Sequence, residues 1–284
     1  MVAIRVWNKC NNNCIMCSNY FVRNIDGGER TFSSMLSRVK EKEPEPKEIT
    51  FTGGEPFLNP GIFDLIVRFR NLYPKTRINI LSNSRLFYYP KYCAKLKKHF
   101  DSNMQLAVSI FGHNSKVHDS VTLTKKSFVQ TAKGIKNLLK LGIPIELRVI
   151  VLQQNVKHLE AIAKYVSKNF KGINYVVFIF VDLVSNAVKN KKIVAVKYTK
   201  TIPHLAKSMD VLKKNNVDFR LYHFPLCILP PEYWKNSWVS VERSKIKPTA
   251  KCKKCTCSKA CVGILKGYYN IFGDAEFKAK RYRK

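Results

Sequence analysis

Short apolar runs alternate along the chain with longer stretches in which apolar residues recur every three or four positions. The apolar, β-branched runs predict strands at Val2–Trp7, Glu48–Phe51, Arg77–Leu81, Met104–Ile110, Ile145–Leu152 and Tyr175–Leu183. The stretches between them predict helices at Thr31–Lys42, Pro60–Leu72, Pro90–Phe100, Ser127–Leu141 and Val156–Asn169. Strands separated by helices of this length are typical of βαβ units in a parallel sheet. We therefore expect an α/β fold, an open or partial barrel, with active-site groups at the C-terminal ends of its strands.

The pattern changes after about Asp182. A lysine-rich stretch, Asn186–Lys200, predicts a loop or lid, and one more helix and strand are expected at Ile202–Asn215 and Asp218–Tyr222. From Phe224 onward, prolines and cysteines replace the periodic pattern. We predict a core domain over residues 1–223 and a small, irregular, cysteine-rich extension with a basic tail over residues 224–284.

The chain carries a formal net charge of +32 within 284 residues, a length that suits one large domain or one domain with a small appendage. Three explanations of the charge stay open. The lysines and arginines are simply solvated, or they face a polyanion such as tRNA. Alternatively they face an acidic protein, which would be a peptide substrate or an electron donor of the flavodoxin or ferredoxin type.

Nine cysteines need an explanation. No signal peptide is visible, since Met1–Trp7 already has the pattern of a strand, and the longest apolar run, Tyr175–Leu183, is too short to span a bilayer. We therefore expect a cytoplasmic protein without a membrane partner. In that compartment reduced thiols bind metal or do chemistry rather than form disulfides.

Cys10, Cys14 and Cys17 form a CxxxCxxC motif directly after the first predicted strand. Three thiolates on one tight loop can hold three irons of a [4Fe–4S] cube and leave the fourth iron open to a ligand. The alternatives are a zinc knuckle or three free thiols. Zinc would require a fourth ligand, and the next cysteine and histidine along the chain are Cys93 and His99.

The motif, followed by Gly53-Gly54-Glu55-Pro56 at the end of the second predicted strand, resembles the radical S-adenosylmethionine (radical SAM) superfamily. The resemblance implies a partial (β/α)6 TIM-like barrel and a glycine-rich loop that contacts the amino group of SAM. Two glycines allow a close backbone approach, and Glu55 or a backbone carbonyl can accept from an ammonium. The implied chemistry is reductive cleavage of SAM to a 5′-deoxyadenosyl radical, which abstracts a hydrogen from the substrate.

The resemblance also implies further SAM contacts along the strand ends. They are Met16 against the adenine, Ser82 and Asn83 after the third strand, Ser109 at the end of the fourth strand and Arg148 on the fifth. In relatives, polar residues at such places bind the ribose and carboxylate of SAM, although each could be an ordinary strand-end residue. The pair His118-Asp119 matches one common in peptide-modifying relatives, but we expect it to be a loop or helix-start pair rather than catalytic.

The extension holds a second cysteine group. Cys227, Cys252, Cys255 and Cys261 supply four ligands, which close a cube completely and resemble the auxiliary-cluster region (twitch or shortened SPASM) of radical SAM maturases. Structural zinc is the competing interpretation, because four cysteines with a CxxC spacing suit Zn²⁺ equally well. Cys257 is surplus and is either a replacement ligand, a functional thiol or an idle cysteine.

We therefore predict a radical SAM enzyme with one auxiliary [4Fe–4S] cluster that oxidatively modifies a peptide or protein side chain. A nucleic-acid-modifying radical SAM enzyme is the first alternative, since basic and aromatic residues are interleaved near the C-terminus. A non-catalytic iron–sulfur protein is the second alternative. It is disfavoured because an open iron is a liability unless SAM fills it.

Overall fold

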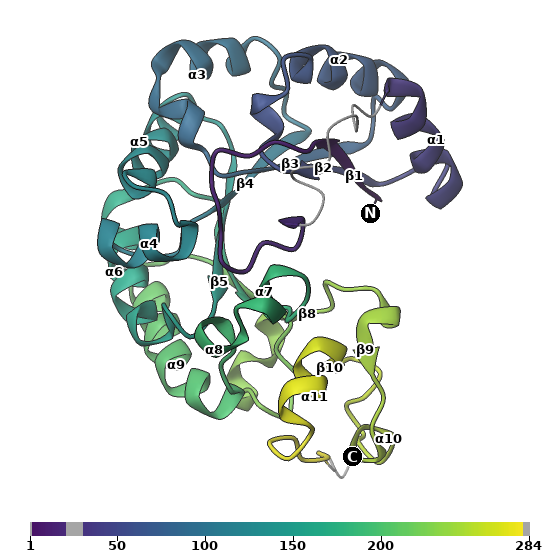
Figure 1. Ribbon diagram of the computed structural model, residues 1–284, viewed down its shortest axis with the longest axis vertical. Helices are drawn as coiled ribbons and strands as arrows, with labels where there is room; N and C mark the ends of the chain where they lie inside the picture. Colours follow the sequence, from purple (N-terminus) through teal and green to yellow (C-terminus); the bar gives the residue numbers. More distant parts are fainter. Residues whose placement is uncertain (1, 21–30, 281–284) are drawn as a thin grey trace.

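The computed structural model describes residues 2–20 and 31–280. Within them, one parallel sheet runs in strict chain order from the first strand to the eighth (Figure 1). Its strands are β1 (Val2–Trp7), β2 (Glu48–Gly53), β3 (Arg77–Ser82), β4 (Met104–Ser109), β5 (Ile145–Val151), β6 (Tyr175–Phe180), β7 (Phe219–Tyr222) and β8 (Ser237–Trp238). The first and last of these strands are the two edges of the sheet. The sheet is therefore the partial TIM-like barrel that the sequence predicts, and the α/β fold class is confirmed.

Helices cover the outer, convex side of the curved sheet (Figure 1). They are α1 (Phe32–Lys42), α2 (Ile62–Leu72), α3 (Pro90–Lys97), α4 (Ser115–Thr122), α5 (Ser127–Lys140), α6 (Leu159–Asn169) and α9 (Tyr198–Lys214). The short helices α7 (Asn186–Lys189) and α8 (Lys191–Val194) lie instead beside the loop of residues 10–17. The rest of the chain adds β9 (Ile246–Lys247), α10 (Ala250–Lys253), β10 (Ile264–Leu265) and α11 (Lys266–Phe272). Short 3-10 turns include Pro56–Leu58, Arg85–Tyr88 and Pro231–Asn236.

The predicted strands and their helices lie where the apolar pattern places them. Three differences have simple causes. The lysine-rich stretch expected as a loop holds α7, α8 and the first turn of α9, because Ala187, Val194 and Val196 are buried anchors within it. The helix α4 was not predicted, since it is only two turns long. The strand β8 has two residues and shows no apolar run of its own.

The two faces of the strands differ in exposure. Outward side chains, such as Ile4, Phe51, Leu106 and Leu147, are fully buried under the helices. Inward side chains are mixed: Arg148 on β5 and Arg220 on β7 stay partly accessible, whereas Gln105, Glu146 and Val177 are buried. A parallel sheet usually has both faces covered. Here the outer face packs under the helices, and the inner face holds buried polar side chains together with a few that stay accessible.

The cysteine-rich extension packs onto the barrel through aromatic rings. Tyr268 on α11 lies with its ring centroid 4.7 Å from that of Tyr198 and 5.8 Å from that of Phe180 on β6. Phe277 packs against Tyr198 at 5.6 Å. The strand β8 also belongs to the barrel sheet, although it lies past residue 223, so the two predicted domains share one sheet. No helix in the described part of the chain is long and apolar enough to cross a membrane.

Candidate functional site

Cys10, Cys14 and Cys17 line one cavity of about 280 Å³ at the C-terminal ends of the strands. The predicted site residues that share this cavity are Met16, Gly53, Gly54, Glu55, Ser82, Asn83 and Ser109. Residues on later strands complete the wall: Phe111, Ile150, Ile179, Phe180, Val181, Asp182 and His223. The cavity therefore brings together the cysteine loop, the glycine-rich loop and the ends of β3 to β7, as expected for a barrel active site.

The loop that carries the three cysteines is fastened to the barrel by its backbone. The backbone N–H groups of Asn13 and Ile15 donate to the carbonyls at the end of α4, at 2.8 and 3.0 Å. From the other side, the side chain of Asn186 donates to the Cys14 carbonyl at 2.9 Å, and that of Asn190 donates to the Ile15 carbonyl at 2.8 Å. The stretch that the sequence predicts as a lid thus contains α7 and α8, which hold the cysteine loop in place.

Two asparagine side chains carry this support, so we expect Asn186→Ala with Asn190→Ala to loosen the cysteine loop. Each lost hydrogen bond should lower the free energy of unfolding by about 1 kcal/mol. The double variant should also release iron from the loop faster under chelator challenge, measured anaerobically by absorbance. Asn215→Ala is the matched control, because its side chain makes the same kind of bond to the Val211 carbonyl on exposed α9. Equal iron release by control and double variant would contradict the assignment.

Hydrogen-bond donors and a cation surround Cys10. The backbone N–H of Asn12 donates to its sulfur at 3.5 Å, and Nδ2 of Asn83 lies 3.9 Å from the same sulfur. Arg85 donates to the Asn11 carbonyl and, at 2.8 Å, to Oδ1 of Asn12. Burial lowers the pKa of Arg85, and the nearby Cys10 thiol acts in the opposite direction. N–H donors and positive charge stabilise thiolates, so three cysteines in this setting fit an iron–sulfur cluster.

The two glycines after β2 are required by a close approach of backbone to backbone. A Cβ on Gly53 would lie 2.1 Å from the Trp7 carbonyl oxygen, and one on Gly54 would lie 2.1 Å from that of Lys9. Gly53 also has φ +129°, a conformation that L side chains rarely adopt. The backbone N–H of Gly54 donates to Trp7 at 2.8 Å. The glycines therefore let the cysteine loop cross the end of β2, in addition to lining the cavity.

Glu55 is buried and accepts hydrogen bonds at both carboxylate oxygens. Oε1 accepts from the Ser82 hydroxyl at 2.8 Å and from the Phe57 backbone N–H at 3.3 Å, while Oε2 accepts from the Asn83 backbone N–H at 2.7 Å. The carboxylate thus ties the glycine-rich loop to the end of β3. Burial raises the pKa of Glu55 to about 7, against the lowering effect of these hydrogen bonds.

The raised pKa predicts a pH-dependent stability. Between about pH 4.5 and 7 the folded chain keeps a proton on Glu55 that the unfolded chain releases, so the free energy of unfolding falls as the pH rises through this window. The shift corresponds to about 3 kcal/mol. Because Glu55→Gln cannot ionise, the difference in unfolding free energy between wild type and variant should shrink by about 2.5 kcal/mol between pH 5 and 8, which is most of that shift. Anaerobic urea titrations measure it, and a pH-independent difference would refute the effect.

Arg148 and the pair His118-Asp119 do not line the cavity. Arg148 pairs in register with Ser109, but its guanidinium donates to the Glu146 carboxylate and it does not line the cavity. Its contact with SAM remains a prediction without support from this geometry. His118-Asp119 lies in α4, where Asp119 accepts from the Ser127 hydroxyl at 2.7 Å and the Phe128 N–H at 2.8 Å. The pair thus lies inside α4 and joins it to α5, instead of standing in a loop or at a helix start as the sequence interpretation expects.

The sequence interpretation missed several polar residues of the cavity wall, among them Asp182 and His223. His223 follows β7 with φ +67°, and its Nδ1 lies 2.8 Å from the Phe180 carbonyl. Burial lowers the pKa of His223. Asp182, just after β6, lies 3.8 Å from Nζ of Lys245 in the extension. The signal that could have found them is their position at a strand end, where barrel sites collect their polar groups: Asp182 lies near the C-terminal end of one predicted strand, and His223 directly follows another.

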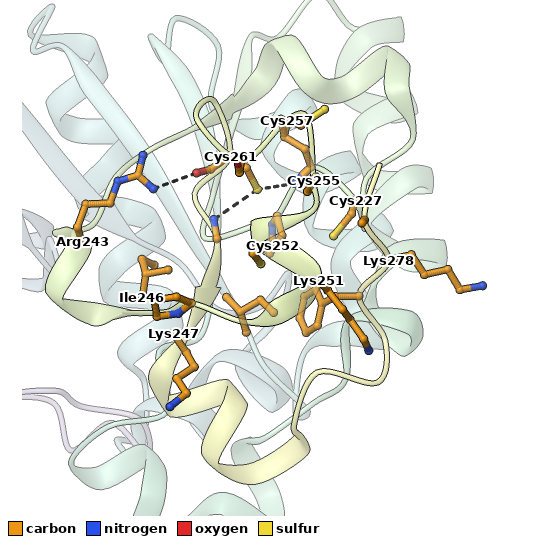
Figure 2. Close-up of a pocket in the computed structure, with 18 residues that line it drawn as sticks. Cys227, Arg243, Ile246, Lys247, Lys251, Cys252, Cys255, Cys257, Cys261 and Lys278 are labelled. Atoms are coloured by element: carbon orange, nitrogen blue, oxygen red, sulfur yellow. Dashed lines mark hydrogen bonds between the residues drawn. The ribbon is translucent and has the colours of Figure 1, made fainter. Parts of the chain in front are cut away.

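The second cysteine group lines a separate cavity of about 250 Å³ in the extension (Figure 2). Cys227 lies in the connection between β7 and β8. Cys252 lies on α10, and Cys255 and Cys261 lie on the loop after α10. Backbone N–H groups donate to their sulfurs: Leu226 and Gly263 to Cys261 at 3.3 and 3.4 Å, and Lys280 to Cys255 at 3.4 Å. Such N–H donors are what buried thiolates around a metal centre need.

Electrostatics group the same four cysteines. Burial raises the pKa of Cys227 to about 11, and Cys261, Cys252 and Cys255 raise it further by like-charge repulsion. Burial is also the main cause of the raised pKa of Cys261. Cys257 lines the cavity as well, but it takes no part in this coupling, and in Figure 2 its sulfur points away from those of Cys227, Cys252 and Cys261. The four predicted ligands therefore face one another, and Cys257 stands at the rim.

Neither cysteine group forms a ready-made site for a single metal ion as the thiols stand. Across residues 2–20 and 31–280, no three cysteine, histidine or carboxylate side chains stand close enough to hold one metal ion. A zinc ion about 2.3 Å from each sulfur would need the thiols to draw closer together. A cube is larger than an ion, and each set of sulfurs already faces a common cavity.

A family model described as the radical SAM superfamily matches residues 4–166, more than half of the chain. The chain therefore belongs to the radical SAM superfamily. Membership of this family implies a [4Fe–4S] cluster and SAM as cofactors. The matched residues run from β1 to the end of α6 and include the three cysteines of the first motif and the glycine-rich loop.

Curated relatives match parts of the chain. An uncharacterized protein of Methanocaldococcus jannaschii is 30% identical over 61% of this chain and 61% of its own length. The antilisterial bacteriocin subtilosin biosynthesis protein AlbA of Bacillus subtilis is 30% identical over 40% of this chain and 25% of its own. A GTP 3′,8-cyclase of Petrotoga mobilis is 27% identical over 54% of this chain and 47% of its own length. The chain thus spans less than two thirds of each of these relatives.

Solved structures share the fold. Streptococcus suis SuiB bound to S-adenosylmethionine superposes with a TM-score of 0.68 at 13% identity, over 98% of this chain and 76% of that one. Native anSMEcpe with bound AdoMet gives a TM-score of 0.58 at 18% identity, over 78% of this chain and 64% of that one. These likenesses establish the radical SAM barrel architecture.

Proposed function

We propose that this radical SAM enzyme oxidatively modifies a side chain of a peptide or protein. Cys10, Cys14 and Cys17 hold the [4Fe–4S] cluster, and the cavity beside them holds SAM. When bound, the cluster and SAM supply hydrogen-atom abstraction. The observation that carries the proposal is that the three cysteines open onto one cavity that is also lined by the glycine-rich loop and by residues at the ends of β3 to β7.

The residues of the chain have separate tasks in this proposal. Gly53 and Gly54 bring backbone to the cavity, and Glu55 fixes the Ser82–Asn83 turn that faces it. Met16, Phe111, Ile150 and Ile179 present apolar surface and exclude water from a reactive site. Ser109 offers a hydroxyl at the end of β4 for a polar group of SAM.

We further propose an auxiliary [4Fe–4S] cluster on Cys227, Cys252, Cys255 and Cys261, with zinc as the competing metal. The shared cavity, the N–H donors to sulfur and the mutual electrostatic coupling of these thiols support it. The electron needed by the first cluster would come from an acidic donor of the flavodoxin or ferredoxin type, which suits the charge of +32. Reduced thiols of this kind persist in the cytoplasm, where we place the enzyme.

Likeness to peptide-modifying proteins supports the substrate class. SuiB, which has also been solved bound to the precursor peptide SuiA, shares the fold over 78% of this chain in that form, with a TM-score of 0.62 at 16% identity. AlbA is named for subtilosin biosynthesis. The net charge of +32 favours a second candidate, modification of RNA, because a polycation attracts phosphates whatever its function.

One experiment separates these candidates. The anaerobically reconstituted protein is reduced with dithionite and incubated with SAM, either with short peptides encoded beside its gene or with bulk tRNA. Formation of 5′-deoxyadenosine together with loss of two hydrogens from a peptide supports the proposal. Modified nucleosides, with tRNA binding that survives at about 0.2 M salt, would transfer the assignment to RNA. An absence of 5′-deoxyadenosine under every condition would favour a non-catalytic iron–sulfur protein.

A further inference from the structure

The inner face of the barrel carries a group of polar and aromatic side chains directly beneath the SAM cavity. Arg220 and Tyr222 on β7 pair in register with Val177 and Ile179 on β6, and Ile179 lines the cavity. Tyr222 pairs in turn with Trp238 on β8. Because side chains alternate along a strand, these residues share the inner face with the cavity wall. The group therefore continues from the floor of the cavity into the barrel.

One charge in this group is already neutralised. The Glu146 carboxylate on β5 accepts from the Arg148 guanidinium, from the Tyr175 hydroxyl at 2.7 Å and from the Gln105 amide at 3.1 Å. Burial raises the pKa of Tyr175 to about 12, so its hydroxyl stays neutral at physiological pH. Glu146 and Arg148 thus cancel in net charge, so any further arginine on this face adds a positive charge.

Arg220 is that second arginine. Its guanidinium carbon lies 3.7 Å from the ring centroid of Tyr175 and 4.3 Å from that of Trp238, on the strands at either side. Among the described residues, no carboxylate lies within ion-pair distance of Arg220. The two rings cover the faces of the guanidinium. Its N–H donors lie along its edge and remain for a ligand in the plane of the guanidinium. Tyr222 accepts one of these donors.

The other ionisable groups near Arg220 do not supply a counter-charge. Burial raises the pKa of Tyr222, and burial lowers that of His223, so both are neutral near pH 7. Asp182, at the cavity wall above, lies beside Lys245 at 3.8 Å. The lumen below the cavity therefore carries one uncompensated positive charge in a planar, aromatic-lined setting. An arginine edge held in this way matches a carboxylate, which it can bind through two parallel hydrogen bonds.

Position and access fit a substrate. Arg220 precedes the cavity residue His223 by three positions, a rise of about 10 Å along a strand. In an extended peptide, about the same distance separates residues that are three positions apart. Trp238, whose ring covers one face of Arg220, is 47% exposed on the edge strand β8, and Arg220 itself stays partly accessible.

We propose that Arg220 binds a carboxylate of the substrate, an Asp or Glu side chain or a C-terminus, and that it anchors the peptide with its reacting residue in the SAM cavity. Arg148, whose Nε is taken up by Glu146, offers its terminal N–H groups on the same face. The inference rests on the proposed peptide substrate, but the site can be tested by binding alone.

The test is anaerobic labelling of the reconstituted protein with phenylglyoxal, an arginine-specific reagent, read per residue by mass spectrometry. Glutarate is the probe for a side-chain carboxylate, and glutaramide is its neutral isostere. Glutarate should protect Arg220 with half-saturation on the order of 1–10 mM, the range of one arginine–carboxylate contact. Arg68 serves as the internal control, because it is half exposed and pairs with Asp64 on the outer helix α2.

Saturable protection of Arg220 by glutarate, with none by glutaramide and none at Arg68, supports the site. Equal protection by both probes, or an Arg220 that the reagent never reaches, overturns it. Stronger protection by inorganic phosphate than by glutarate overturns the carboxylate assignment and directs the search to a phosphate-bearing substrate. Since no outcome requires turnover, a protected Arg220 in a protein that modifies no peptide would leave the anion site standing and reject the proposed function.

Discussion

Replacement of Cys10, Cys14 and Cys17 together by alanine is expected to remove about four irons per chain and to abolish SAM cleavage. These thiols are the only cysteines that line the cavity of the described barrel, and three ligands are the minimum set that holds a cube with one open iron. We expect 5′-deoxyadenosine formation to fall at least about 1,000-fold, since the reaction has no route without the cofactor. Iron assay and anaerobic chromatography of 5′-deoxyadenosine measure the two effects.

Cys93→Ala provides the matched control for this variant. Cys93 is buried in α3, its thiol donates to the Phe87 carbonyl at 3.2 Å, and burial raises its pKa to about 11. Its removal changes one cysteine and a little core packing, but neither cavity. Full iron content in the triple variant, or equal loss in Cys93→Ala, would show that the loop does not hold the cluster.

Replacement of Cys252 and Cys255 by alanine is expected to remove about four further irons while the first cluster stays loaded. The two thiols face Cys227 and Cys261 across the extension cavity, so their loss leaves two ligands, too few for a cube. We expect intact protein to carry about eight irons and the double variant about four, with 5′-deoxyadenosine still formed in the absence of substrate. Modification of the peptide should be lost.

Cys257→Ala is the control for the auxiliary site, because it removes a thiol from the same loop and cavity without touching the coupled set. It should retain all iron. Loss of zinc with no loss of iron in the Cys252 and Cys255 variant would replace the auxiliary cluster by a structural zinc site. Iron loss in Cys257→Ala would instead exchange one of the four proposed ligands.

Much of the fold followed from periodicity. Each predicted strand has alternating or continuous apolar residues whose outward side chains form the core, as Ile4, Ile80 and Leu147 do, and this signal is local to the strand. Short elements were not predicted, because their own sequence is too short to carry such a signal. The strand β8 has two residues and takes its place in the sheet only by pairing with β7, so nothing in its own sequence marks it.

The candidate site divides along similar lines. The CxxxCxxC loop and the glycine-rich loop were visible because their chemistry lies within a few consecutive residues. Arg148 was expected at SAM from its strand position, yet its guanidinium turns toward Glu146, two residues earlier on the same face. The choice between those two partners depends on what the neighbouring strands place beside Glu146, here Tyr175 and Gln105.

The sequence by itself determined the class of fold, the family and the two cysteine groups, because each is encoded in residue types and spacings along short segments. Only the tertiary structure decided that Gly53 and Gly54 are needed where Trp7 and Lys9 approach the end of β2, and that Arg220 lies between two rings without a carboxylate in ion-pair distance among the described residues. The physical reason is register. Lateral pairing of strands sets which distant side chains share a level of the barrel, and charge balance and burial follow from that pairing.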